Sequence, residues 1–516
     1  MLFSSDRKLT ENLKKTTKMK LKYLSILLII SNLTFGQKTD NRLIGLDTEI
    51  QNILKSYNAV GLSVAITEND KTIYSKGFGF RDFESKLIVT ENTIFPIGSI
   101  TKSFTASLLG ILENQNKLSL KNKPSLYIPN FQFYNDKMDN LITIEDFLCH
   151  KSGIGSVDGT YVLFPANKRE DLMERLKYLK PNGAIKDSWI YSNLGYIIAG
   201  TLVEKISNES WEKNIQDKIF KPLNMNSSSI SITEMTKNKD FSFGYGINNS
   251  KSEKVLFAEL NNDKPGGSIN SNVNDMANWM KTWLNNGNFN NIEVLPKNYI
   301  QEATSIKAID NGLPPETSDP NVYTFGYGYG WKINSNKGHY KVHHGGNVSG
   351  FSSQLVIYPT DNLGIVVLTN QNNSLLPYIV ADIITNRMLK LQKTEWNKYP
   401  VKVSDINIVS KEIKSVNTEK KLTHSLADYC GKYSNLGFGT FEIVNENNNL
   451  FAVFPEYKFR LEHQYYDIFI LKAIKEIPQI MNPEFYLNFT IDNDGNVSTV
   501  KINLQEEPIE FLKQNK

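Results

Sequence analysis

Three short segments, far apart in the chain, contain the residue types that an acyl-transfer reaction needs: Ser99-Ile-Thr-Lys102, Tyr191-Ser-Asn193 and His344-Gly-Gly346. A serine hydroxyl is a weak nucleophile until a base removes its proton, and a lysine three residues further along a helix faces the same side, one turn later. Tyrosine can transfer protons, asparagine offers a donor and an acceptor, and a glycine-lined strand lets backbone N–H groups reach a developing oxyanion. If the three segments meet in the fold, the chain is a serine hydrolase.

The Ser-x-x-Lys pattern alone is not specific, because it also begins at Ser5 and at Ser210. Ser99 differs in its context. It follows the strand-end and turn signal of residues 95–98 and opens a run of helix-forming residues. The apolar positions of that run have the spacing of one helix face and are Phe104, Leu108, Leu109 and Leu112. The sequence therefore predicts Ser99 at a helix N-terminus, where its hydroxyl is accessible and the helix dipole favours negative charge.

The elements around these segments predict an α+β fold. The region from residue 95 to about residue 287 is mostly helical and loop. Alternating and apolar runs on either side of it predict strands at 61–67, 71–77, 340–342, 353–358 and 364–369. Strands at both ends of a helical insertion indicate one antiparallel β-sheet flanked by helices, plus an all-α subdomain. A cleft between the sheet and this subdomain is where we expect the site.

The C-terminal part of the chain is expected to form a second domain. Residues 393–420 are polar and charged without clear periodicity, which is typical of a linker. Residues 421–516 contain short alternating runs separated by Asn, Asp and Gly, which predict a small all-β domain. The Tyr-Ser-Asn that begins at Tyr433 belongs to this domain and is expected to be a strand-end turn. The proposed hydrolase domain then covers residues 37–392.

Residues 1–36 have the three regions of a signal peptide, with lysines before an apolar stretch from Leu24 to Phe35 and small residues near Gly36. Twelve residues in a helix rise about 18 Å, which is short of a hydrocarbon core of ~30 Å, so no stable membrane span is expected. We therefore expect a periplasmic or secreted protein of a bacterial envelope. Initiation at Met19 would give a more ordinary signal, so the true start, Met1 or Met19, stays open.

Composition indicates a globular protein without affinity for nucleic acid. The chain has 516 residues, of which 40% are hydrophobic. Seven of the 58 Lys and Arg residues and two of the 54 Asp and Glu residues lie in residues 1–36, so the remainder has 51 basic and 52 acidic residues. A near-neutral chain without a basic run gives no electrostatic case for nucleic acid. The two cysteines, Cys149 and Cys430, fall in different expected domains, so no disulfide framework is expected, and Cys149 is expected to be a small buried residue.

Six segments have a recognisable pattern, and they are residues 95–106, 143–154, 221–225, 265–271, 325–331 and 344–352. Together they resemble the serine β-lactamase and penicillin-binding-protein superfamily, nearest to its class C-like serine hydrolases. The likeness spans roughly residues 42–392, and Cys149 stands where the family usually has Thr. The small β-domain also resembles one that is often appended to these hydrolases.

In a site of this kind Ser99 would attack a carbonyl and form an acyl-enzyme. Lys102, if burial and positive neighbours kept it neutral, would take the serine proton. Tyr191 would pass a proton to the leaving group and then help to activate the hydrolytic water, while Asn193 would hold the substrate amide. The family pattern implies that the N–H groups of Ser99 and Asn347 form the oxyanion hole, where one donor typically contributes ~2.7–4 kcal/mol.

His344 departs from the Lys-Thr-Gly of many relatives, in which the ammonium attracts a substrate carboxylate. A histidine, with a reference pKa of about 6.5, is mostly neutral at pH 7, which weakens the case for an obligatory carboxylate. We expect His344 and Gly346 to line the substrate-binding cleft on the strand that carries Asn347. The neighbouring His343 points to the opposite face of that strand, so no metal site is expected, and the resemblance implies no cofactor.

Two classes of function remain open. The first is a secreted serine hydrolase that acts on an amide or ester of a small molecule or peptide, as a β-lactamase, a D-amino-acid peptidase or an esterase. The second is a non-catalytic penicillin-binding-like protein that recognises cell-wall peptide. The presence of Ser99, Lys102, Tyr191 and Asn193 together favours the first, because a pure binding protein needs no activated nucleophile. The substrate, the oligomeric state and the role of the β-domain are left open.

Overall fold

The structure, a computed structural model, describes residues 40–155, 163–166, 168–248, 251–311, 325–393, 395–396, 420–474, 485–504 and 507–514. The expected signal peptide and most of the expected linker lie outside these residues.

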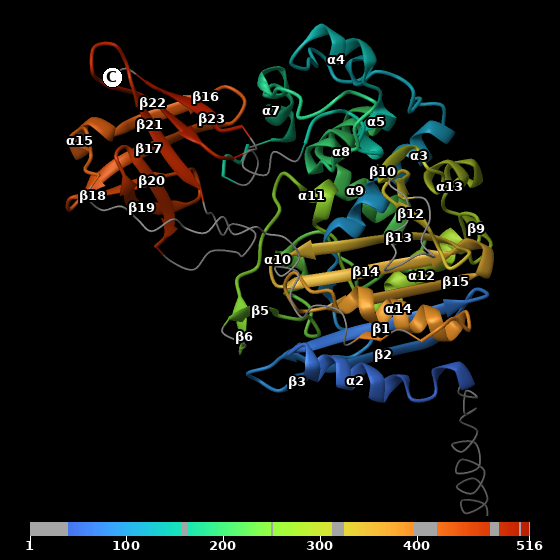
Figure 1. The fold of residues 1–516 in the computed structure, drawn as a ribbon. Coiled ribbons are helices and arrows are strands. Elements are labelled where there is room, and N and C mark those ends of the chain that lie inside the picture. Colours follow the sequence, from blue (N-terminus) through green and yellow to red (C-terminus); the bar gives the residue numbers. More distant parts are fainter. Residues whose placement is uncertain are drawn as a thin grey trace, which may run out of the picture. The chain divides into compact units, whose positions relative to one another are not determined.

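An antiparallel sheet of nine strands forms the centre of the hydrolase part, in the order β10-β11-β12-β13-β14-β15-β1-β2-β3 (Figure 1). The first and last parts of the domain meet in this sheet, because β1 pairs with β15 from Leu62–Thr369 to Glu68–Leu363. The strands are β1 (Gly61–Glu68), β2 (Lys71–Asp82), β3 (Leu87–Ile88), β10 (Ala308–Asn311), β11 (Phe325–Tyr327), β12 (Lys332–Asn336), β13 (His339–Val348), β14 (Phe351–Tyr358) and β15 (Leu363–Thr369).

The central strands are covered on both faces. All residues of β14 and β15 are buried, without the alternation of a strand that has one face in water. Helices α12 (Val273–Leu284) and α14 (Leu376–Met388) both pack against these two strands, while α2 (Leu46–Ser56) precedes β1. The centre of the sheet is therefore a buried layer, whereas few residues of the outer strands β2 and β3 are buried.

A helical region, inserted between β3 and β10, lies beside the β13 side of the sheet (Figure 1). Its centre is α3 (Thr101–Asn114), which is buried along most of its length and packs against α8 (Asn193–Ser207) and α11 (Lys264–Gly267). The buried hydroxyl groups of α3 are hydrogen-bonded, for example Ser103 to the carbonyl of Ile100 and Thr105 to the carbonyl of Pro265. The surrounding helices are α4 (Asp136–Leu141), α5 (Ile144–Leu148), α7 (Arg169–Met173), α9 (Trp211–Ile215), α10 (Ile232–Met235) and α13 (Lys297–Ala303).

The C-terminal part is a closed barrel of eight strands. Buried and exposed residues alternate along most strands, as in β17, because one face of a closed sheet points inward. Tyr433 is the middle residue of β16 and Asn435 is its last, and the Asn435 side chain accepts backbone hydrogen bonds from Gly437 and Phe438, so this second Tyr-Ser-Asn does terminate a strand. The strands are β16 (Gly431–Asn435), β17 (Gly439–Glu446), β18 (Asn449–Val453), β19 (Lys458–Tyr465), β20 (Ile468–Ala473), β21 (Tyr486–Ile491), β22 (Val497–Ile502) and β23 (Ile509–Lys513).

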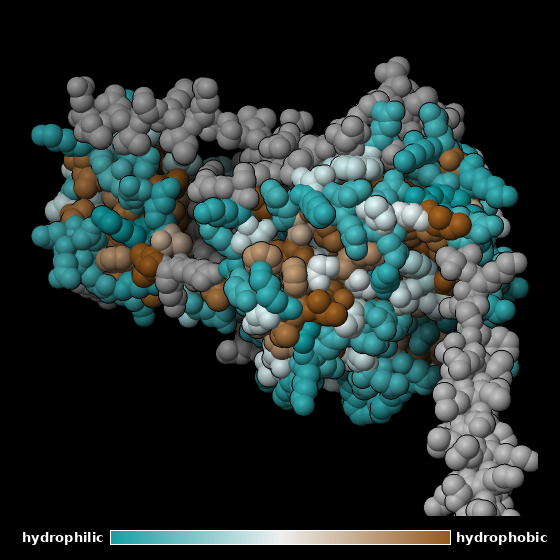
Figure 2. Space-filling model, turned by 90° about the horizontal axis from the view of Figure 1, so that it is seen from below, coloured by the Kyte–Doolittle hydropathy of each residue, from teal (hydrophilic) through white to brown (hydrophobic). Residues whose placement is uncertain are grey.

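The predicted fold class is confirmed: an antiparallel sheet with flanking helices, a helical region and a C-terminal all-β part. On the face drawn in Figure 2, hydrophilic residues are spread over most of the described surface and hydrophobic residues form small groups between them. Across the described ranges, no helix has both the length and the apolar character needed to cross a bilayer.

Candidate active site

Ser99 lies on a short 3-10 turn immediately before α3 and is partly exposed, so its hydroxyl is accessible. The preceding residue, Gly98, has a φ of +54°, which L side chains rarely adopt. A Cβ added to Gly98 would also lie only 2.8 Å from the backbone nitrogen of Asn347. Glycine at position 98 thus gives Ser99 its place on the turn and lets β13 approach the nucleophile.

Lys102 is fully buried, and its Nζ has three polar contacts. It lies 3.2 Å from Ser99 Oγ, 2.6 Å from Asn193 Oδ1 and 2.8 Å from the carbonyl oxygen of Gly266. The last two oxygens can only accept hydrogen bonds, whereas a serine hydroxyl can also donate. As an ammonium, Nζ can donate to all three oxygens; as a neutral amine it would keep its two N–H donors on Asn193 and Gly266 and turn its lone pair towards Ser99. This arrangement suits proton transfer from the serine to Lys102.

Tyr191 and Asn193 reach the same site from the start of α8. Ser192 caps this helix by accepting a hydrogen bond from the N–H of Gly195, which leaves Asn193 as the first helical residue. The ring centre of Tyr191 lies 4.8 Å from Lys102 Nζ, close enough to stabilise a lysine ammonium once a proton has been taken. In the described part of the chain, the Tyr191 hydroxyl has no hydrogen-bonding partner and does not bond to Ser99. The structure therefore brings the tyrosine ring to the lysine and leaves its hydroxyl free for a reacting group.

The strand β13 presents a backbone edge to the nucleophile. Pairing between β12 and β13 stops at His343, and in the described sheet residues 344–348 pair only with β14. On the nucleophile side, a Cβ added to Gly346 would lie 2.0 Å from the carbonyl oxygen of Ile97, so the strand and the turn are in close contact. The Asn347 nitrogen, at the same edge, lies against the turn that carries Ser99, which suits a shared oxyanion hole.

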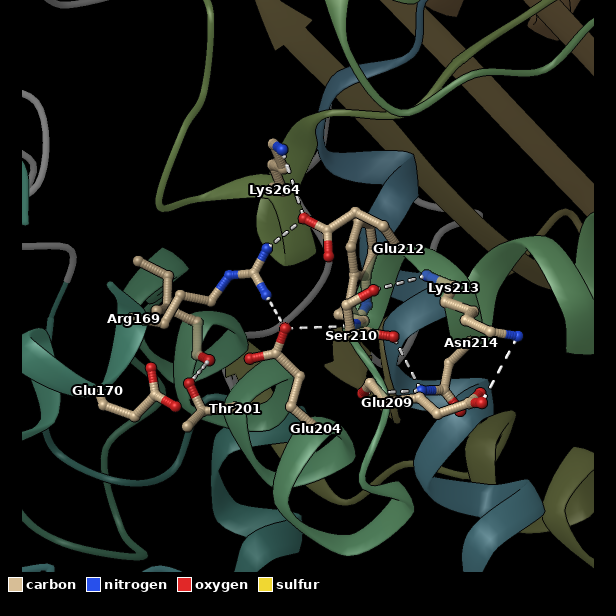
Figure 3. A network of polar contacts seen from close by, with 12 residues as sticks. Arg169, Glu170, Thr201, Glu204, Glu209, Ser210, Glu212, Lys213, Asn214 and Lys264 are labelled. Carbon is tan, nitrogen blue, oxygen red and sulfur yellow. Dashed lines mark hydrogen bonds and ion pairs between the residues drawn. The ribbon is translucent and has the colours of Figure 1, made fainter. Parts of the chain in front are cut away.

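An ion-pair network beside the site holds α11, which contains Gly266 (Figure 3). Arg169 is nearly buried and bridges two carboxylates, Glu204 on α8 and Glu212 on α9, the latter at 2.6 Å. Lys264, the first residue of α11, lies 3.4 Å from the same Glu212 oxygen. Burial acts to raise the pKa of Glu212. The charge of Arg169 and several smaller effects act in the opposite direction and together lower the pKa. The network thus joins helices α7, α8 and α9 to α11, whose Gly266 carbonyl contacts Lys102.

Comparison with families of known proteins identifies this part of the chain. The family described as "Beta-lactamase" matches residues 46–383, which is more than half of the chain. The chain belongs to the β-lactamase family. Membership in this family supports a serine hydrolase, and the resemblance inferred from the sequence motifs is confirmed. A second match, to "Domain of unknown function (DUF3471)", covers residues 417–513 of the barrel part.

Individual proteins are also similar to this chain. Protein flp of Staphylococcus aureus (strain NCTC 8325 / PS 47) is 28% identical over 343 residues, which are 66% of this chain and 65% of that protein. The chain thus spans just under two thirds of the length of the staphylococcal relatives that it matches. "Unguisins hydrolase ungD'" of Aspergillus campestris is 27% identical over 370 residues, 68% of this chain and 66% of that protein. The octameric penicillin-binding protein homologue from Pyrococcus abyssi has the same fold, with a TM-score of 0.58 and 23% identity over 91% of this chain and 99% of that one.

His344 replaces the lysine of many β-lactamase relatives, and the structure buries it. Only 3% of its surface is exposed. Its Nδ1 lies 2.6 Å from the carbonyl of Gly345 and its Nε2 lies 2.8 Å from the hydroxyl of Tyr327. Because a carbonyl only accepts, Nδ1 carries the proton and Nε2 accepts from Tyr327. Both ring nitrogens are therefore bonded within the protein, and His344 is almost fully buried, whereas the sequence led us to expect it to line the substrate-binding cleft.

Burial, with Lys102 adding to it, lowers the pKa of His344 to about 3. The pKa values of His150 and His343 are likewise lowered, mainly by burial. Above its unfolded pKa of about 6.5, such a histidine is neutral in both the folded and the unfolded chain. As the pH falls below 6.5, the unfolded chain binds a proton that the folded chain does not, so the fold loses stability until the pH reaches the folded pKa.

We therefore expect the free energy of unfolding to fall as the pH is lowered from 7 to 4. His344 alone should contribute a loss of about 2 kcal/mol at pH 5, at 1.36 kcal/mol per pH unit below about 6.5. Urea unfolding at several pH values measures this. The variant His344→Gln cannot titrate at this position, so its unfolding free energy should depend less steeply on pH, by the equivalent of about one proton. Equal slopes for both proteins would contradict the burial of a neutral His344.

The described residues near the site include two further reactive side chains, His343 and Cys149. Among the described residues, no group of three or more His, Cys, Asp and Glu side chains could hold a metal ion. His343 Nδ1 lies 3.1 Å from Nε2 of Gln354, on the other face of β13 from His344. Cys149 is buried, and burial raises the pKa of its thiol to about 12, which keeps it protonated. Cys430 is also a free thiol.

Three residues that contribute to the site were not assigned a role from the sequence. They are Gly266, whose carbonyl contacts Lys102; Tyr327, which contacts His344; and His150, which contacts the Tyr191 segment. Each lies in a segment that carries the family resemblance. That resemblance was the available signal, but it gives no side-chain contacts.

Proposed function

We propose that this protein is a secreted serine hydrolase that acts on an amide or ester through an acyl-enzyme on Ser99, as a β-lactamase, a D-amino-acid peptidase or an esterase. The contact set of Lys102 carries this proposal: two obligate acceptors occupy Nζ, and the third contact is the hydroxyl of Ser99. A protein that only binds its ligand has no use for a buried amine in this position. The name of the fungal relative, a hydrolase, agrees with the proposal.

In the proposed reaction Ser99 Oγ attacks the substrate carbonyl as its proton passes to Lys102. The N–H groups of Ser99 and Asn347 receive the oxyanion, and Asn193 holds the substrate amide. Tyr191 gives its hydroxyl proton to the leaving group and is reprotonated by the Lys102 ammonium. Water then attacks the acyl carbon with the help of Tyr191, its proton passes to Lys102, and Lys102 returns a proton to Ser99 Oγ as the acyl–oxygen bond breaks. His344 is neutral and internally bonded, so it supplies no cation for a substrate carboxylate, which favours substrates whose recognition does not depend on one.

The proposed periplasmic or secreted location depends on residues 1–36, whose lysines and apolar stretch have the pattern of a signal peptide. Export in a bacterial host would be accompanied by cleavage near Gly36, which N-terminal sequencing of the mature protein detects.

We expect a fluorescent penicillin or a fluorophosphonate to label the protein once per chain, with the adduct on the peptide that contains Ser99. Intact-mass measurement and peptide mapping test this, alongside turnover of a chromogenic cephalosporin, a D-alanyl-D-alanine peptide and a p-nitrophenyl ester. Labelling that persists in Ser99→Ala would refute the assignment of the nucleophile. A stable adduct without turnover of any substrate would instead support the penicillin-binding alternative.

A further inference from the structure

Tyr191 needs an external support, because its ring must face the lysine while its hydroxyl stays free. In the described part of the chain that hydroxyl has no hydrogen bond, and the residue lies on an extended segment just before α8. A tyrosine without a bonded hydroxyl can rotate about its side-chain torsions unless its backbone and ring are held. The residues packed around the ring should therefore determine where the hydroxyl lies.

His150, which follows the short helix α5, contacts the backbone on both sides of Tyr191. Its carbonyl oxygen accepts a hydrogen bond from the N–H of Ile190 at 2.9 Å, and its Nδ1 accepts one from the N–H of Ser192 at 3.1 Å. Its ring centre lies 4.4 Å from that of Tyr191, with the planes tilted by 43°. One residue thus holds the N–H groups of the residues on either side of the tyrosine and also packs against its ring.

Two further features show that His150 is held in place by its surroundings. The residue has a φ of +62°, a left-handed conformation that costs a non-glycine residue about 1–2 kcal/mol, so the surrounding contacts must hold it there. Since Nδ1 accepts a hydrogen bond, Nε2 carries the proton, and this buried N–H has no hydrogen-bonding partner among the described residues. The ring is enclosed by aromatic side chains, including Tyr327 with its centre at 4.6 Å.

We propose that His150 is a positioning residue for the acyl-transfer reaction, acting through Tyr191 by holding the N–H groups of Ile190 and Ser192. It touches neither the nucleophile nor a reacting atom. This inference rests on the proposed hydrolase function.

A matched pair of variants separates the hydrogen bond from the packing. Asparagine can place an acceptor oxygen near the position of Nδ1 and tolerates the left-handed conformation, whereas leucine has nearly the same shape and cannot accept. We expect His150→Leu to lower kcat 10- to 100-fold with a change in KM of less than threefold, and His150→Asn to recover most of the loss. Equal losses in both variants, or no loss in either, would overturn the role of the hydrogen bond.

A double-mutant cycle tests whether the effect passes through the tyrosine. In a Tyr191→Phe background, which lacks the hydroxyl to be positioned, His150→Leu should lower kcat by less than threefold further. Additive losses would mean that His150 only supports the fold. Should the leucine variant fail to fold, His150→Gln, which displaces the acceptor, takes its place in the cycle. If the unmodified protein hydrolyses no substrate in the panel, the proposed function fails and this inference with it.

Discussion

Replacement of Lys102 by methionine is expected to lower kcat/KM for a p-nitrophenyl ester by roughly 10³–10⁴-fold, the upper range for loss of a general base. Methionine has a similar length and fills the buried space, but it cannot take the proton of Ser99. It also leaves the oxygens of Asn193 and Gly266 without their contact to Nζ. The Gly266 carbonyl is buried, and an unsatisfied buried acceptor costs about 1–3 kcal/mol, so a lower midpoint of urea unfolding should accompany the loss of activity.

The chain contains a control for this substitution. Lys213 follows Ser210 with the same spacing, and Ser210 caps α9 by accepting a hydrogen bond from the N–H of Lys213 (Figure 3). The Lys213 side chain is exposed and pairs with Asp217 and Glu209 at the surface. Lys213→Met should therefore leave kcat/KM unchanged. A loss of less than tenfold in Lys102→Met would show that Lys102 is not the base.

Replacement of Gly346 by alanine is expected to lower kcat by about 10²–10³-fold, the effect of losing one oxyanion donor. The new Cβ would lie 2.0 Å from the carbonyl oxygen of Ile97 and 2.6 Å from Ser353 Oγ, which itself donates to that carbonyl. Only a movement of β13 away from the nucleophile turn relieves this overlap, and the N–H of Asn347 moves with the strand. We expect a loss of about 1–3 kcal/mol in unfolding free energy as well.

Gly345→Ala is the matched control for this prediction. At Gly345 the nearest atom to an added Cβ is Oε1 of Gln354, at 3.1 Å, and this atom is the end of a flexible side chain. Steady-state kinetics of the two variants should therefore differ by at least tenfold in kcat. Similar rates for both would show that the contact between β13 and the turn does not define the oxyanion hole.

The sequence predicts well those features that depend on neighbouring residues. The placement of Ser99 before a helix, and of Lys102 on the same side one turn later, depends only on local spacing. Strand β13 was expected over residues 340–342 but extends from His339 to Val348. Gly345 and Gly346 weaken the strand signal, and pairing with β14 and contact with the turn provide what the local sequence lacks.

Features that depend on contacts between residues far apart in the chain could not be predicted from the local sequence. Gly266 is 164 residues from Lys102, and no local pattern shows that its carbonyl meets the amine. The buried place of His344 depends on Tyr327, which is brought beside it by the register of β11, β12 and β13. Closure of the barrel likewise depends on pairing between Tyr433 and Lys513, at opposite ends of that part of the chain.

The contact between the nucleophile turn and the sheet has a consequence for the way activity is gained during refolding. The hydrogen bond from Ser353 to Ile97 joins residues that are 256 positions apart. Contacts of such long sequence separation form slowly, because a large loop must close before they contribute. The oxyanion hole can exist only after both the helical region and the sheet are in place. Hydrolysis should therefore return later than helix content, and enzyme activity would report the completion of folding.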